Sequence, residues 1–164
     1  MKEAPVNIQE VVDKVTTNQI AFALTWLGRA NTDLDLWTLP EPGEAWVYWA
    51  MPRTRQAVLH RDVRTAQTDQ ASFDSTWFER SEVTVVNHSR LSAVEAWINA
   101  YAAAGDITGR VLVVWKGRRA ERPFRFEAVV GDRASNQSQR EHNPAWQRID
   151  LSALFPEAFA NHDP

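Results

Sequence analysis

Two aspartates separated by one leucine are the residues of this sequence whose types and spacing best suit chemistry. Asp33, Asp35 and Trp37 stand at every second position of the stretch 32–37. Alternate side chains of an extended strand share one face, so we expect both carboxylates on one side and the intervening leucines on the other. Two such carboxylates lie roughly 7 Å apart along a strand, which is too far for one ion unless the backbone bends. We expect that bend where the loop at Asn31 and Thr32 leads into the strand.

Clustered carboxylates predict a calcium site, because calcium binds about six to eight oxygen atoms. Asp62 is the expected third ligand beside Asp33 and Asp35, and Asp74 and Glu79 are weaker alternatives. A purely structural interpretation stays open. In it, Asp33 and Asp35 cap the end of a β-sandwich by accepting hydrogen bonds from backbone amides.

The chain is also rich in tryptophan, with eight in 164 residues. Flat aromatic faces on a β domain can stack on sugar rings or hold apolar peptides. Trp37, Trp46 and Trp77 are the members we expect to be exposed in such a carbohydrate or peptide platform. The alternative is that most of the indoles fill the core, because each one buries a large apolar area.

A basic stretch lies between residues 110 and 125, where six Lys or Arg residues face a single acid, Glu121. Arg118, Arg119 and Arg122 are its candidate contacts for an acidic protein partner or for anionic lipid headgroups. Charged hairpin tips also serve simply to keep a sheet edge soluble, and that interpretation stays open.

Other function classes lack support in the sequence. The four histidines, at positions 60, 88, 142 and 162, show no metal-ligand spacing, there is no cysteine, and no Gly-rich phosphate loop or nucleophile motif occurs. We therefore predict that the protein is not an enzyme. The 18 Lys and Arg against 21 Asp and Glu give a net charge of −3, which disfavours binding to nucleic acid. No apolar run reaches the length of a membrane span.

The elements that must position these residues are mostly strands. Alternating β-forming stretches separated by turn residues predict an antiparallel β-sandwich, immunoglobulin-like or jelly-roll-like. A capping box followed by apolar residues at helical spacing predicts a short N-terminal helix over residues 8–15. The predicted strands cover residues 19–26, 34–39, 45–51, 82–86, 110–116, 124–130 and 146–151.

One segment supports two interpretations. A capping box at Ser92 and Glu95, with Gly105 at the far end, favours a helix over residues 93–104. The alternation of Trp97, Asn99 and Tyr101 favours a strand instead. We predict a helical segment at 1–18, a β-sandwich domain at 19–151 and a C-terminal tail at 152–164.

Most of this domain resembles the YfaP-like bacterial domains of unknown function. The resemblance rests on the Thr-Asp-Leu-Asp-Leu run at residues 32–36, the Pro-Gly turn at 42–43 and the aromatic strand at 47–49, and it extends over about residues 19–117. It favours a strand at 94–102. The run is more distantly similar to the TerD-like calcium-binding β-sandwiches. The resemblance implies an accessory role at the bacterial envelope. Taken with the residues above, we predict a non-catalytic binding or accessory module that engages a protein partner, with the tryptophan platform for a carbohydrate or peptide as the alternative. The resemblance also implies the bacterial periplasm or secretion if a signal was removed, and otherwise the cytoplasm.

Overall fold

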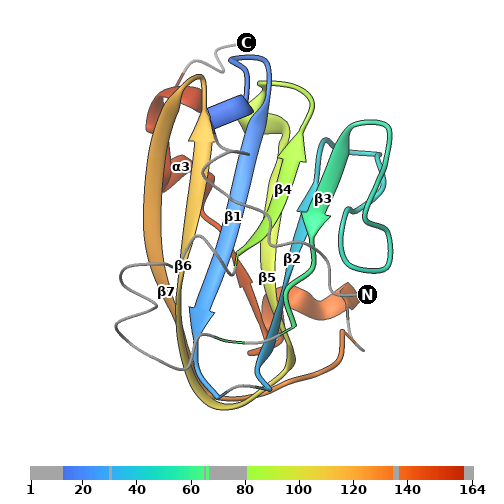
Figure 1. Cartoon of the computed structure of the whole chain (residues 1–164), viewed down its shortest axis with the longest axis vertical. Coiled ribbons are helices and arrows are strands. Elements are labelled where there is room, and N and C mark those ends of the chain that lie inside the picture. Colours follow the sequence, from blue (N-terminus) through green and yellow to red (C-terminus); the bar gives the residue numbers. More distant parts are fainter. Residues whose placement is uncertain (1–12, 30, 65, 67–80, 135–136, 161–164) are drawn as a thin grey trace.

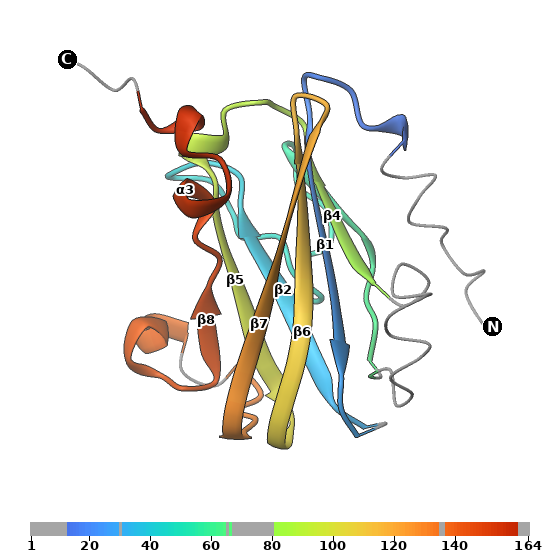
Figure 2. The same ribbon diagram turned by 90° about the vertical axis from the view of Figure 1, so that its left-hand side faces the viewer.

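The protein is a sandwich of two antiparallel sheets (Figures 1 and 2). The computed structural model describes residues 13–160 except 30, 65, 67–80 and 135–136. A five-stranded sheet has the order β3-β4-β1-β6-β7, and a three-stranded sheet has the order β2-β5-β8. The strands are β1 (Ile20–Leu27), β2 (Asp33–Leu39), β3 (Ala57–Arg61), β4 (Glu82–Val86), β5 (Glu95–Ala102), β6 (Ala104–Trp115), β7 (Arg118–Val130) and β8 (Trp146–Arg148). The predicted all-β class is confirmed.

Alternation along β1 explains how the two layers pack. Phe22, Leu24 and Trp26 are almost completely buried and belong to the main core cluster between the sheets. Ala21 and Ala23 point to the opposite face, where they join a smaller apolar cluster against which Val15 packs. Both faces of the five-stranded sheet are therefore apolar at its centre.

The ambiguous segment 93–104 is a strand over most of its length, as the alternation indicated. Residues 95–102 form β5, which lies between β2 and β8 at the centre of the three-stranded sheet. Pairing on both edges satisfies the backbone groups of β5, and this tertiary environment overrides the local helical propensity of its alanines. Only a single turn of 3-10 helix, Leu91–Ala93, precedes the strand.

Two predicted strands are wrong in whole or in part. Residues 45–51 form no regular strand and pair only through isolated bridges, Thr38 with Val47 and Tyr48 with Met51. The second bridge folds this segment back on itself just before Pro52, so it cannot extend a ladder. The last strand ends at Arg148, because Asp150 caps a short helix, α3 (Leu151–Leu154), by accepting a hydrogen bond from the Ala153 amide.

The hairpin predicted after residue 116 is present between β6 and β7. Its two turn residues, Lys116 and Gly117, have φ values of 50° and 75°. Two successive positive φ values are typical of the type I′ turn, whose twist matches that of the strands it joins. Arg118 and Arg119 follow this turn directly.

The chain termini depart from the predicted pattern. Most of the helix expected over 8–15 falls outside the described residues, and only Asp13 and Lys14 are helical within them, so no N-terminal helix is evident there. After α3, the 3-10 turn Pro156–Ala158 follows, and Phe155 between them is buried against Trp115. Among the described residues, no helix is both long and apolar enough to cross a bilayer.

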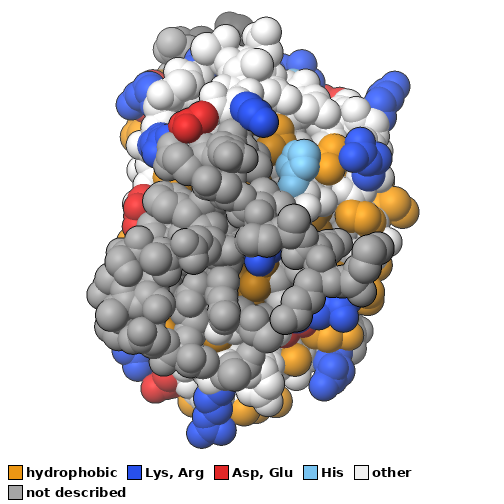
Figure 3. Space-filling view, viewed as in Figure 1, with side chains coloured by type: hydrophobic (Ala, Val, Ile, Leu, Met, Phe, Trp, Pro, Cys, Tyr) orange, Lys and Arg blue, Asp and Glu red, His pale blue; other side chains and the backbone are white. Residues whose placement is uncertain are grey.

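In Figure 3, hydrophobic side chains reach the surface on the side where β3 and its preceding loop lie.

Candidate metal centre

The paired aspartates lie at the start of β2, where a β-bulge bends the sheet. Asp33 pairs with Ala102 and the next residue, Leu34, pairs with Ala100, so Tyr101 is an extra residue on the neighbouring strand β5. A bulge kinks the strand pair and redirects side chains, and bulges are common beside functional sites. The bend that two carboxylates need to approach one ion is therefore associated with Tyr101, and not only with the loop at residues 31–32.

Two further carboxylates come from the other side of the sandwich. Asp62 follows β3 and Glu82 opens β4, so both belong to the five-stranded sheet, whereas Asp33 and Asp35 belong to the three-stranded one. One carboxylate oxygen from each of these four residues lies within 4.8 Å of the others. The predicted trio Asp33, Asp35 and Asp62 is thus brought together, and a fourth acid completes it. These four residues are called the acidic cluster below.

Glu82 forms the floor of the acidic cluster and is only 1% exposed. Its Oε2 accepts a hydrogen bond of 2.9 Å from the Leu36 amide, and its Oε1 accepts one of 3.2 Å from the Val63 amide. In the described part of the chain, β2 is an edge strand of the three-stranded sheet, so no described strand pairs with the Leu36 amide on that side. Glu82 therefore links the two sheets, because its carboxylate accepts hydrogen bonds from backbone amides that take no part in strand pairing.

Asp35 is the most unusual member, because it is 2% exposed and its Oδ2 accepts no hydrogen bond from any residue that the structure describes. Asp33 Oδ1 is likewise buried without a partner. A buried carboxylate oxygen that accepts no hydrogen bond is costly, and such atoms are rare in folded proteins. Both unsatisfied oxygens belong to the acidic cluster, which is where a bound cation would satisfy them.

Burial and mutual repulsion raise the pKa values of three of these acids. Burial, followed by the negative charge of Asp62, raises the pKa of Asp33 to about 6. Burial, followed by the charges of Asp33 and Asp62, raises the pKa of Asp35 to about 8. Burial and the neighbouring Asp35 and Asp62 also raise the pKa of Glu82 well above its ordinary value. Without a cation, the acidic cluster therefore retains protons near neutral pH.

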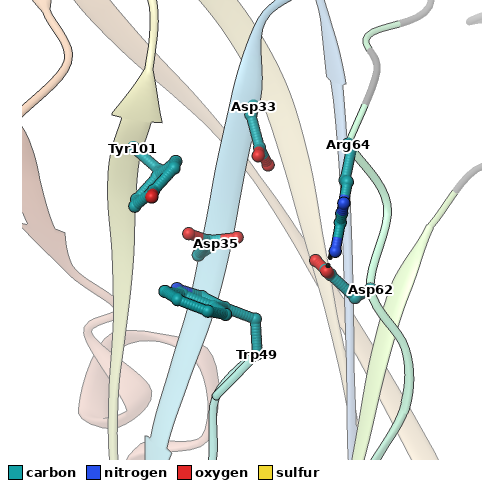
Figure 4. Close-up of a pocket in the computed structure, with 6 residues that line it drawn as sticks. All are labelled: Asp33, Asp35, Trp49, Asp62, Arg64 and Tyr101. Atoms are coloured by element: carbon teal, nitrogen blue, oxygen red, sulfur yellow. Dashed lines mark hydrogen bonds and ion pairs between the residues drawn. The ribbon is translucent and has the colours of Figure 1, made fainter. Parts of the chain in front are cut away.

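A cavity of about 250 Å³ opens directly onto the acidic cluster (Figure 4). Asp33, Asp35 and Asp62 line it together with Trp49, Tyr101 and Arg64. Arg64 pairs with Asp62 at 3.3 Å, so a positively charged guanidinium group faces the acids from the rim of the cavity. The acidic cluster is thus buried from below by Glu82 and accessible from the cavity.

The chemistry of these donors suits a hard cation. Calcium–oxygen distances of about 2.3–2.6 Å place opposite ligand atoms about 5 Å apart, which accommodates the spacing observed here. The acidic cluster can therefore hold a metal ion.

Comparison with protein-family models, with curated proteins and with solved structures gives no match. The resemblance to the YfaP-like and TerD-like families accordingly stays a prediction.

The predicted aromatic platform is not formed as expected. Trp37 is 1% exposed, so the expectation that a ligand could reach it is wrong. Its ring stacks on Tyr48 with centroids 3.8 Å apart, because the segment that follows β2 folds over this face. Trp46 is half-buried, and Trp77 lies outside the described residues.

An arginine occupies the centre of the buried indoles. The Arg140 guanidinium lies 4.2 Å from the ring centroid of Trp46 and 5.0 Å from that of Trp146, with Trp37 and Trp97 just under 6 Å away. Cation–π attraction of this kind is strongest on tryptophan. Two of the three tryptophans predicted to bind a ligand, Trp37 and Trp46, thus lie around an arginine of the same chain.

The basic residues of the β6–β7 hairpin are largely paired within the chain. Arg118 pairs with Glu157 and lies over the Phe155 ring, and Arg119 pairs with Asp13 at 3.4 Å. Arg122 is exposed. Asp74 and Glu79, the weaker candidates for calcium, lie outside the described residues.

Sequence reasoning missed four residues of the site: Glu82, Trp49, Tyr101 and Arg64. The available signal for Glu82 was an acid opening a strand that otherwise consists of Val and Thr. Trp49 had a weaker signal, because the turn that leaves it 41% exposed is not encoded by any local motif. Tyr101 is placed by a bulge that depends on pairing between two strands.

Proposed function

We propose that this protein is a non-catalytic β-sandwich module that binds one calcium ion in the acidic cluster and uses the calcium-loaded surface to engage a partner. The observation that carries the proposal is Asp35, one of four converging carboxylates, which is 2% exposed and whose Oδ2 has no hydrogen-bond partner among the described residues. A bound cation would offset the repulsion among these acids and would coordinate the carboxylate oxygens that lack a hydrogen-bond partner.

The donor set favours calcium over other common metal ions. Zinc sites are usually built with His nitrogen and Cys sulfur, whereas all four candidate ligands here are carboxylates. Magnesium prefers a near-ideal octahedron at about 2.0–2.1 Å and keeps several waters. Calcium tolerates irregular sets of oxygens at longer distances, which suits ligands supplied by two different sheets.

Binding should stabilise the fold, because the acidic cluster assembles only when both sheets are in place. A ligand that binds the native state alone stabilises it by RT ln(1 + [L]/Kd), or about 2.7 kcal/mol at one hundred times Kd. For a domain of this length, that corresponds to about 5–11 °C in melting temperature. At pH 7, binding must also displace the proton from Asp35, whose pKa of about 8 lies above the working pH.

The test is a melting curve at pH 7 in excess EDTA and again in millimolar calcium, with magnesium as the comparison ion. We expect calcium to raise the melting temperature by several degrees and magnesium to raise it less. Glu127→Gln, which removes an exposed acid outside the acidic cluster, should retain the full calcium response. Identical curves in EDTA and calcium would overturn the proposal.

A further inference from the structure

We propose that the calcium-loaded acidic cluster recognises a neutral sugar, whose vicinal hydroxyl groups complete the coordination of the ion while its ring packs against Trp49 and Tyr101. This inference rests on the proposed function, since it requires the ion, and it adds the chemical class of the ligand.

The first support is the incomplete coordination that the protein offers. Glu82 is the most deeply buried member of the acidic cluster and accepts a backbone hydrogen bond at each oxygen, whereas Asp33, Asp35 and Asp62 line the cavity. Calcium takes about six to eight oxygens, so four carboxylates leave positions to fill. Those positions face the cavity, because the opposite side is closed by the fully buried Glu82. A pair of ligand hydroxyl oxygens can occupy them.

The second support is the pair of aromatic rings at the mouth of the cavity. Trp49 is 41% exposed, and its ring lies 5.7 Å from that of Tyr101 at an interplanar angle of 65°. Figure 4 shows the two rings on adjacent sides of Asp35, so that they form a corner around the carboxylate. A sugar presents apolar C–H groups on one face and hydroxyls at its edge, which matches an aromatic wall beside an ion.

The third support is the size of the cavity. Its volume of about 250 Å³ is smaller than the roughly 300–1,000 Å³ of pockets that enclose drug-sized ligands. This is space for one small ring. A shallow site of this kind suits a single terminal residue of a glycan better than an extended peptide.

The fourth support is the charge balance, which separates a neutral ligand from an anionic one. Arg64 lines the cavity and pairs with the Asp62 carboxylate at 3.3 Å, so its positive charge lies at the acidic cluster. Arg133 lies over the Tyr101 ring, with 5.5 Å from its guanidinium carbon to the ring centroid. Two arginines and one calcium ion balance four carboxylates. The loaded site is therefore close to neutral, which favours hydroxyl groups over a carboxylate or an ammonium group.

The test is isothermal titration of the full chain with methyl α-mannoside, L-fucose, methyl β-galactoside and methyl β-glucoside, each in millimolar calcium and in EDTA. We expect at least one of these sugars to bind in calcium and none to bind in EDTA. Trp49→Ala should weaken that binding at least tenfold while the calcium-induced rise in melting temperature remains. Trp49→Phe should retain most of the affinity, and Met51→Ala, an exposed apolar residue outside the cavity, should retain all of it.

Other outcomes separate this inference from the function on which it rests. A normal calcium response with no binding of any of the four sugars would overturn the sugar site and leave the calcium module standing. Binding of acetate in calcium, with no binding of sugars, would overturn it in favour of a carboxylate-bearing partner. Sugar binding that persists in EDTA would refute the role of the ion, and absence of any calcium response would remove both proposals.

Discussion

Replacing Asp35 with Asn should have opposite effects in the presence and in the absence of calcium. In the metal-free protein at pH 7, folding must keep Asp35 protonated, because its pKa of about 8 in the native state lies far above the unfolded value of about 3.9. Each unit between the unfolded pKa and the working pH costs about 1.4 kcal/mol. Asn is nearly isosteric and carries no charge, so Asp35→Asn removes this cost. We expect a gain of about 1–4 kcal/mol in EDTA.

In calcium, the same substitution replaces a negatively charged carboxylate ligand with a neutral amide, whose single oxygen binds the ion more weakly. Losing even an outer-sphere partner of a metal commonly costs tenfold to hundredfold in affinity. A hundredfold loss, at a calcium concentration one hundred times the original Kd, lowers the calcium-dependent stabilisation from about 2.7 to about 0.4 kcal/mol. The rise in melting temperature on adding calcium should therefore fall to about 1–2 °C.

Urea unfolding in EDTA and in calcium measures both effects on one protein. Glu127→Gln is the matched control, since it removes one exposed negative charge and should change neither quantity by more than about 0.5 kcal/mol. A variant Asp35→Asn that is less stable than the parent in EDTA, or that retains the full calcium response, would refute the reasoning.

Two further predictions follow from burial and from the indole cluster. In EDTA, the free energy of unfolding of the parent protein should fall as pH rises from 4 to 8. In this range native Asp33 and Asp35, with pKa values of about 6 and 8, hold protons that the unfolded chain has already released. Equal free energies of unfolding at pH 5 and pH 8 would contradict this prediction. Arg140→Ala should destabilise the protein by about 1–3 kcal/mol, since the guanidinium stacks on the Trp46 ring and packs among three other indoles. Arg140→Lys should recover part of the loss, and chemical denaturation that shows no difference between the parent and Arg140→Ala would contradict the stabilising role of this contact.

The parts of the fold that the sequence predicts are those set by local periodicity. Asp33 and Asp35 share a face because β2 alternates, and β4 and the β6–β7 hairpin follow from β-branched runs and a two-residue turn. Residues 45–51 have the same composition as a strand but fail to become one. Their pairing depends on a partner strand with a free edge, and the chain turns back at Tyr48 and Met51 instead.

The acidic cluster shows the same limit. Asp33 and Asp35 can be paired from their spacing, but Glu82 is 46 residues from its hydrogen-bond partner Leu36, and only the order of strands brings the two together. The burial of Trp37 also depends on residues distant in the sequence. Its position on the same strand face as Asp33 and Asp35 had suggested that it was exposed. The residues that bury it, Tyr48 and Trp146, come from a loop and from the last strand. Such burial depends on long-range topology that no local pattern encodes.

The position of Glu82 ties the ion to the mechanics of the sandwich. This carboxylate begins a strand of one layer and holds an amide of an edge strand in the other, while two further acids of the acidic cluster project from that same edge strand. An ion bound there would resist sliding of the two sheets past each other, and its loss would weaken the contact between them. Slower exchange of the Leu36 and Val63 amide hydrogens would then report ion occupancy, independently of whatever the cavity holds.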